Sequence, residues 1–102
     1  MIHVLVAVEL NPGRRRDFLA EFHRIVPLVR QEQGCIEYGP AIDFASGIAA
    51  QAPLRDDVVT IIEKWESLAD LQAHLIAPHM MEYRPRVKEM IVRSTLHVLE
   101  SA

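Results

Sequence analysis

Two histidines, His74 and His79, stand five positions apart on either side of Pro78 in a chain of 102 residues. Imidazole titrates near neutral pH and is the side chain that most often takes or gives a proton in catalysis. The spacing leaves two interpretations of His74: a general base that faces a cavity, or a histidine at the end of a helix, where the helix dipole favours the imidazolium ion. Metal-binding pairs usually stand three or four residues apart on a helix, and no cysteine or further acid falls at a matching spacing, so we predict no metal site.

A carboxylate lies in the apolar segment 58–66, where Glu63 shares one face of the predicted strand with Val59, Ile61 and Trp65. Burying a carboxylate among such side chains is costly unless it is paired or protonated. Glu63 therefore orients a histidine or acts as a base, or else it forms an ion pair with an arginine on the sheet surface. Trp65 is either a wall for a flat aromatic ligand or the largest anchor of the core.

Three further side chains are weaker candidates for a functional role. Tyr38 and Tyr83 either place a phenol in a pocket or belong to the core with a hydrated hydroxyl group. Cys35 has no basic partner nearby in the sequence, and we expect a buried, unreactive thiol. The four glycines form neither a phosphate-binding loop nor a dinucleotide-binding motif, and no G-x-S-x-G motif is present.

The elements that must position these residues are predicted from hydrophobic periodicity. Strict or near-strict alternation predicts four strands, over 2–10, 35–44, 58–66 and 91–100. Helical spacing predicts a helix over 14–33, with a bend at Pro27 and a stop at Gly34. A second helical region opens with a capping box at Ser67, and Pro78 divides it into two helices. The segment 45–57 is predicted to be a long excursion, with a short strand at 48–50.

The predicted order β-α-β-β-α-β is typical of an α+β, ferredoxin-like domain that spans residues 1–102, with an antiparallel sheet and helices on one face. Because Val59, Ile61 and Trp65 are too apolar for bulk water, we expect the sheet to pack against a second sheet in a homodimer. The mixed face of strand 2–10, which carries His3, is expected to border a partly hydrated cavity.

Composition excludes several classes of protein. The net charge is −3, which gives no basic surface for nucleic acid, and the single cysteine allows no internal disulfide. No apolar run approaches the roughly 20 residues that span a bilayer. The first residues lack the basic region and cleavage site of a signal peptide. We therefore expect a cytoplasmic protein without a membrane span.

Three strings stand at separations that resemble the antibiotic biosynthesis monooxygenase family and, within it, the small quinol monooxygenases: Gln33–Tyr38, Ile62–Ser67 and Ala73–Met80. The resemblance covers essentially the whole chain. It implies a dimeric α+β barrel in which each protomer holds an apolar cavity between sheet and helices. It also implies oxidation of a hydroquinone or related aromatic phenol by molecular oxygen, without flavin, haem or metal. The substrate is then the reductant, and the protein binds it, deprotonates it and excludes water.

The resemblance also implies roles for single residues. His74 becomes the candidate base or the hydrogen-bond partner of the phenolic oxygen, Trp65 flanks the aromatic ring, and Glu63 orients a polar neighbour. The remaining substrate-binding candidates are Tyr38, Ile61, His3, and, at the mouth of the cavity, His79 and Tyr83.

The sequence argues against haem degradation and leaves two other functions open. Haem-degrading relatives pair a coordinating histidine with an Asn-Trp couple, whereas the only asparagine here is Asn11, in the first turn. An isomerase acting on a small phosphorylated ketose requires cationic groups at the cavity, for which Arg84, Arg86 and Arg93 are candidates. A dimeric ligand-binding module without catalysis is the second alternative.

Overall fold

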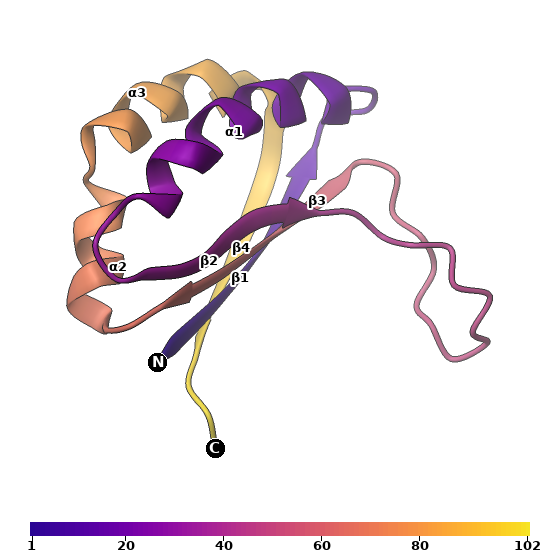
Figure 1. Cartoon of the computed structure of the whole chain (residues 1–102). Helices are drawn as coiled ribbons and strands as arrows, with labels where there is room; N and C mark the ends of the chain where they lie inside the picture. Colours follow the sequence, from indigo (N-terminus) through magenta and orange to yellow (C-terminus); the bar gives the residue numbers. More distant parts are fainter.

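The computed structural model describes residues 1–102 and has the predicted order of elements. They are β1 (Ile2–Leu10), α1 (Arg15–Arg30), β2 (Cys35–Ala41), β3 (Val58–Trp65), α2 (Leu68–Leu75), α3 (Pro78–Val87), a 3₁₀ turn (Lys88–Met90) and β4 (Ile91–Leu99). The four strands form one antiparallel sheet in the order β2-β3-β1-β4. All helices lie on one face of it (Figure 1). The α+β class, the antiparallel sheet and the ferredoxin-like order are thus confirmed.

The core lies between the sheet and α1. The helix presents Phe18, Phe22 and Val29 at helical spacing, and none of the three has exposed surface. They belong to one cluster of 17 buried residues that also contains Val59 and Trp65 of β3. Each of these large apolar side chains contributes about 1.5–3 kcal/mol when it leaves water.

This core corrects the expectation for the apolar face of β3. Val59, Ile61 and Trp65 share a face, as alternation predicted, but the helices of the same chain cover that face. These three side chains therefore need no second subunit to leave water. Alternation determines which residues share a face of a strand but carries no information about which face the helices cover.

Helix boundaries differ from the prediction by a few residues. α1 continues through Pro27 and ends at Arg30, after which the Gln31 N–H donates to Leu28 O and the Glu32 N–H donates to Val29 O. Pro78 divides the second helical region as predicted, at the first position of α3. No helix of the chain combines the length and the apolar character needed to cross a membrane.

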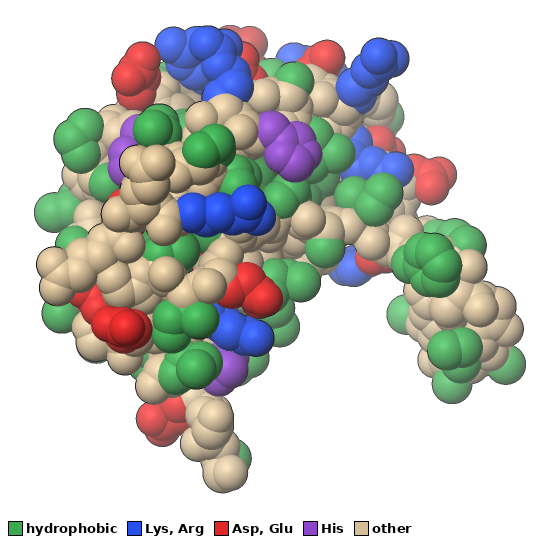
Figure 2. Space-filling view, viewed as in Figure 1, with side chains coloured by type: hydrophobic (Ala, Val, Ile, Leu, Met, Phe, Trp, Pro, Cys, Tyr) green, Lys and Arg blue, Asp and Glu red, His purple; other side chains and the backbone are tan.

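The connection between β2 and β3 projects away from the body of the molecule (Figure 1). It contains no strand, so the short strand expected at 48–50 is wrong, and β2 ends at Ala41. A bidentate ion pair from Arg55 to Asp43, with distances of 2.9 Å, closes its base. The connection carries exposed apolar side chains, among them Phe44 and Ile48. Hydrophobic side chains gather on the projecting segment at the right of Figure 2.

Gly34 turns the chain from α1 into β2, with φ at +79°. A Cβ at this position would lie 2.7 Å from the Cβ of Asp70, whose N–H is held by the cap residue Ser67. We expect Gly34→Ala to lower the free energy of unfolding by about 2 kcal/mol or more, because a left-handed alanine costs about 1–2 kcal/mol before the clash is added.

Gly13→Ala is the matched control. Gly13 has the same φ of +79°, but a Cβ there would meet nothing within 4 Å. Urea unfolding of both variants should therefore separate the backbone strain from the steric clash. Equal losses in the two variants would mean that the contact with Asp70 relaxes without cost.

Candidate active site

A cavity of about 440 Å³ lies between the sheet and the helices α2 and α3. Fifteen residues line it and twelve of them are hydrophobic. Val4 and Val6 of β1 form part of its floor, which is the strongly apolar side of that strand. The cavity is bordered by Leu96 and Val98 of β4, whose side chains are 55% and 47% exposed because no helix covers β4. This is the hollow, largely apolar chamber that the resemblance implied.

His74 lines this cavity from the last turn of α2. The Ser67 side chain accepts the N–H of Asp70 at 3.1 Å and so fixes the start of that short helix. The imidazole is only 1% exposed. Its ring centre is 4.7 Å from that of Trp65 and 5.3 Å from that of Tyr38. His74 thus has both positions that the sequence left open, because it faces the cavity and also lies in the C-terminal turn of α2.

Glu63 is the buried carboxylate of the cavity wall, with 6% exposure. Its Oε1 accepts a hydrogen bond from Trp65 Nε1 at 2.9 Å and lies 3.8 Å from His74 Nε2. Burial raises the pKa of Glu63, while the Trp65 hydrogen bond and His74 act in the opposite direction. No arginine pairs with Glu63, so the predicted alternative of a surface ion pair is wrong.

Trp65 is completely buried at the end of β3. It is not among the residues that line the cavity, and it reaches the site only through its contacts with His74 and Glu63. The geometry matches the second interpretation of this residue, an anchor of the core, better than a wall for a flat ligand.

Ile61 and the two tyrosines do line the cavity. Tyr38 stacks on Phe22 with ring centres 5.3 Å apart. Burial raises the pKa of both Tyr38 and Tyr83 above the ordinary value. Both side chains therefore remain neutral phenols at neutral pH, and neither is suited to act as a base.

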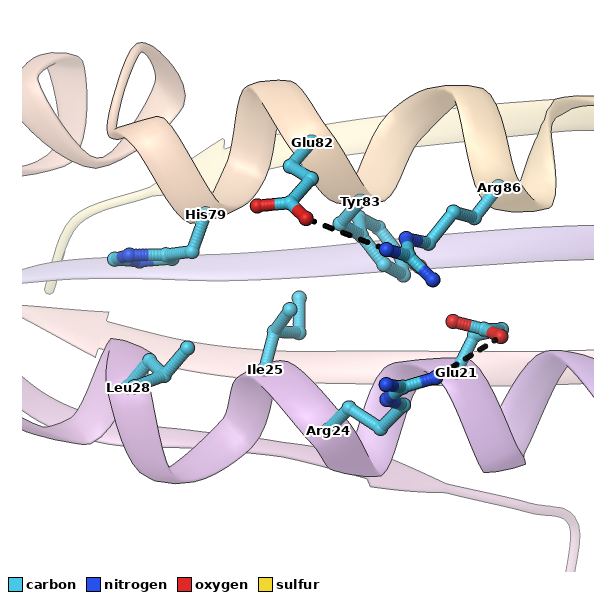
Figure 3. Close-up of a pocket in the computed structure, with 8 residues that line it drawn as sticks. All are labelled: Glu21, Arg24, Ile25, Leu28, His79, Glu82, Tyr83 and Arg86. Atoms are coloured by element: carbon cyan, nitrogen blue, oxygen red, sulfur yellow. Dashed lines mark hydrogen bonds and ion pairs between the residues drawn. The ribbon is translucent and has the colours of Figure 1, made fainter.

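His79 lies outside the cavity, in a groove of about 250 Å³ between α1 and α3 (Figure 3). Ion pairs flank this groove: Glu21 with Arg24 on α1, and Glu82 with Arg86 on α3. Tyr83 lines both the groove and the cavity. His79 is therefore separated from the apolar chamber whose mouth it was expected to line.

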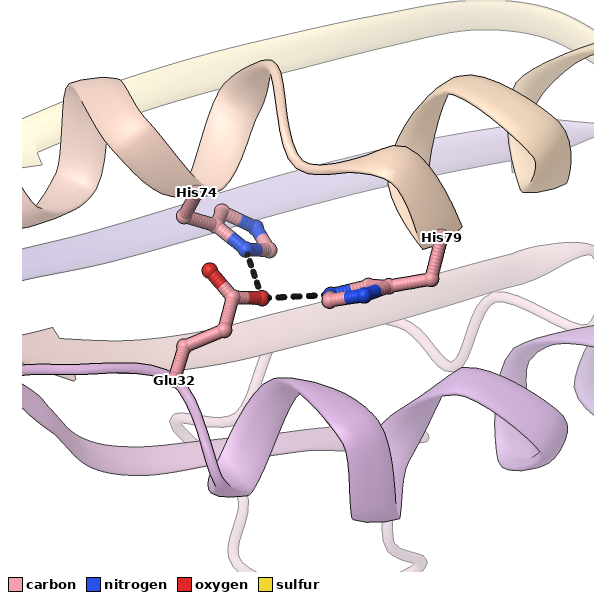
Figure 4. Close-up of side chains that lie close together, drawn as sticks. All are labelled: Glu32, His74 and His79. Atoms are coloured by element: carbon pink, nitrogen blue, oxygen red, sulfur yellow. Dashed lines mark hydrogen bonds and ion pairs between the residues drawn. The ribbon is translucent and has the colours of Figure 1, made fainter.

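Glu32 joins the two histidines, although no sequence pattern selects it. Its Oε2 lies 2.9 Å from His74 Nδ1 and 2.7 Å from His79 Nε2 (Figure 4). Glu32 lies in the turn after α1, where its N–H donates to Val29 O at 2.9 Å. An acid thus does stand beside the histidines, contrary to the expectation from spacing. The one available signal was its position directly before Gln33, where the first family-like string begins.

His3 lies in a separate hollow, together with Leu5, Lys64 and Leu99. On β1 it alternates with Val4, which faces the cavity. The mixed face of this strand does border a hollow, as expected, but the apolar cavity that His74 lines is on the other side, so His3 does not line that cavity. Cys35 is half-buried rather than buried, and burial, Glu32 and Glu63 all raise the pKa of its thiol.

Comparison with known families gives one match, to the model described as antibiotic biosynthesis monooxygenase, over residues 1–86. The chain belongs to this family. Among curated members, it is 38% identical to "Probable quinol monooxygenase YgiN" of Escherichia coli K12, over 98% of this chain and 97% of that protein. The protein of the same name in Shigella flexneri matches equally well. Membership of a monooxygenase family supports an oxidoreductase.

Solved structures share the fold of this chain. A conserved protein from Methanosarcina mazei superposes with a TM-score of 0.84 at 19% identity, covering 99% of this chain and 92% of that one. Rv0793 from Mycobacterium tuberculosis gives a TM-score of 0.80 at 24% identity, covering 99% and 94%. At these identities the comparison supports the fold alone.

Proposed function

We propose that this protein is a monooxygenase that oxidises a hydroquinone or related aromatic phenol with molecular oxygen and requires no flavin, haem or metal for the reaction. The observation that carries the proposal is a buried histidine, His74, in the wall of an apolar cavity with the carboxylate of Glu32 on one of its ring nitrogens. The similarity to quinol monooxygenases supports the substrate class.

The two ring nitrogens of His74 have different surroundings. When Nδ1–H donates to Glu32 Oε2 at 2.9 Å, Nε2 carries the lone pair. This nitrogen then accepts the phenolic proton. In hydrolytic triads, likewise, a carboxylate orients the histidine and the histidine takes the proton. Glu63 Oε1, 3.8 Å from Nε2, is close enough to stabilise the imidazolium ion that forms.

The reaction balances without an external reductant. A hydroquinone and one O₂ yield a hydroxylated quinone and one water, so one oxygen atom is inserted and the other is reduced by substrate electrons. Deprotonation makes the substrate electron-rich enough to give an electron to oxygen. A cavity of about 440 Å³ has the volume of ordinary small-molecule sites, and its apolar lining favours both a two-ring aromatic substrate and O₂ over water.

We also propose that the protein acts as a homodimer. Val92, Leu96 and Val98 on β4 are 61%, 55% and 47% exposed, and the last two border the cavity. Exposed apolar side chains grouped on an edge strand are typical of a protein interface. A second copy over β4 would both bury these side chains and close the cavity.

The isomerase alternative has less support from the geometry. None of the residues that line the cavity is an arginine or lysine. Arg84 and Arg93 line a neighbouring hollow, where Arg93 is paired with Glu9 at 2.9 Å, and Arg86 is paired with Glu82 at 3.3 Å. A phosphate group in the cavity would therefore lack a cationic partner.

The proposal predicts that protein treated with chelator oxidises menadiol, a two-ring hydroquinone, well above the buffer rate in air and not under nitrogen. With ¹⁸O₂, one labelled oxygen atom should enter the quinone product, because the reaction is a monooxygenation. Mass spectrometry of the product measures this. An unlabelled quinone would contradict oxygen insertion. A rate equal to the buffer background, with menadiol bound, would favour the non-catalytic module instead.

A further inference from the structure

The cluster of Glu32, His74 and His79 brings together three side chains that can each bind a metal ion. The three side chains come from the turn after α1, the end of α2 and the start of α3, and one ligand atom from each lies within 4.8 Å of the other two (Figure 4). We propose that these residues bind a divalent first-row transition metal ion of the zinc class. Bound metal would hold His74 in a form that cannot serve as a base.

The donor set is that of known three-ligand sites. Two imidazole nitrogens and one carboxylate oxygen hold catalytic zinc with an open position, and the same set holds non-haem iron. Ligands about 2.0–2.1 Å from a tetrahedral zinc ion are roughly 3.3–3.4 Å apart. The observed separations from Glu32 Oε2 are 2.9 Å to His74 Nδ1 and 2.7 Å to His79 Nε2. To admit the ion, Glu32 must therefore move away from each nitrogen by roughly half an ångström.

The charges near Glu32 are compatible with a cation. Its only ion-pair partners are the two histidines, and no lysine or arginine pairs with it. In the metal-free protein, ring N–H groups can satisfy this carboxylate. A metal ion would take their place through the nitrogen lone pairs, once each ring carries its proton on the other nitrogen.

A carboxylate lies near the second nitrogen of His74 and would have to move closer to accept a hydrogen bond from it. With Nδ1 bound to metal, the proton of His74 moves to Nε2, which faces Glu63 Oε1 at 3.8 Å. The Trp65 N–H holds that oxygen at 2.9 Å. A carboxylate behind a ligating histidine is the common outer shell of metal sites. The same proton position removes the lone pair that the proposed oxidation uses, so metal binding should inhibit it.

The ion has a route that avoids the substrate cavity. The His79 side chain is 22% exposed and lines the groove between α1 and α3 (Figure 3), whereas that of His74 is 2% exposed and lines the cavity. Metal therefore approaches from the groove, and its remaining coordination positions are open to water on that side.

The test is a calorimetric titration of tag-free, chelator-treated protein with Zn²⁺, followed by Co²⁺ titration read from visible absorption. We expect one ion per chain, and at least a tenfold loss of affinity in both His79→Ala and Glu32→Gln. His23→Ala is the matched control, because His23 is exposed on α1 outside the cluster. This variant should bind Zn²⁺ with the wild-type affinity.

Two results would overturn the proposal: no stoichiometric binding by the wild-type protein, or equal affinity of wild type and a folded His79→Ala variant. Because His79 is partly exposed, this variant should keep its fold even if Glu32→Gln does not, and circular dichroism checks both. Metal affinity is measured without substrate. A protein that binds Zn²⁺ but never oxidises menadiol would contradict the proposed function alone, and an active protein that binds no metal would contradict this inference alone.

Discussion

His74→Gln should lower kcat for menadiol oxidation by about 10²–10⁴-fold, the usual contribution of a general base. Glutamine retains a polar group that can donate to Glu32, 2.9 Å from the native Nδ1, but its amide cannot accept a proton from the substrate. Glutamine is preferable to alanine because the imidazole is 1% exposed and packs against Trp65 and Tyr38. Alanine would leave a void and lower stability as well as activity.

His97→Gln provides the matched control for this measurement. His97 is exposed on β4 and lines neither the cavity nor the groove, so the change should leave kcat and the melting temperature near the wild-type values. Steady-state oxygen consumption measures kcat and KM for all three proteins. A folded His74→Gln variant with kcat within about twofold of wild type would exclude His74 as the base. Glu63, the carboxylate of the cavity wall, would then be the candidate.

The elements were predictable from the sequence because each has a strong local pattern. β1 alternates without interruption over Ile2–Leu10, and Pro78 stands where a proline favours the first turn of a new helix. The orientation of β3 was not predictable, because period-two alternation is identical whichever face the helices cover. The same ambiguity put His3, on the mixed side of β1, among the residues expected to bind the substrate.

The candidate site was only partly predictable, for a related reason. His74 and Glu63 were selected because each is a titratable side chain within an apolar pattern, and both do line the cavity. Glu32 is not part of an apolar pattern of this kind. It stands 42 residues from His74 and 47 from His79, and only the packing of α1 against the sheet and α3 brings it to them. Spacing rules for ligand pairs on one helix do not apply to residues that converge from three elements.

Trp65→Ala should lower the free energy of unfolding by about 3–5 kcal/mol, as expected for truncating a large aromatic side chain in the core. The indole has no exposed surface, and its ring centre lies 4.7 Å from that of His74. The change also removes the N–H that donates to Glu63 at 2.9 Å, which leaves a buried carboxylate without its donor. Urea denaturation monitored by circular dichroism measures the loss.

Trp65→Phe separates packing from the hydrogen bond. Phenylalanine keeps most of the apolar contact but has no N–H, so we expect a smaller loss of stability, about 1–3 kcal/mol, from the unpaired Glu63 and the smaller ring. The pKa of Glu63 should also rise further, because the indole hydrogen bond opposes the effect of burial. A Trp65→Ala variant within about 1 kcal/mol of wild type would contradict the role of Trp65 as a core anchor. If instead Trp65→Phe is stable but slow, with kcat reduced and KM unchanged, the indole acts on the reaction through Glu63 and His74 rather than by holding the substrate.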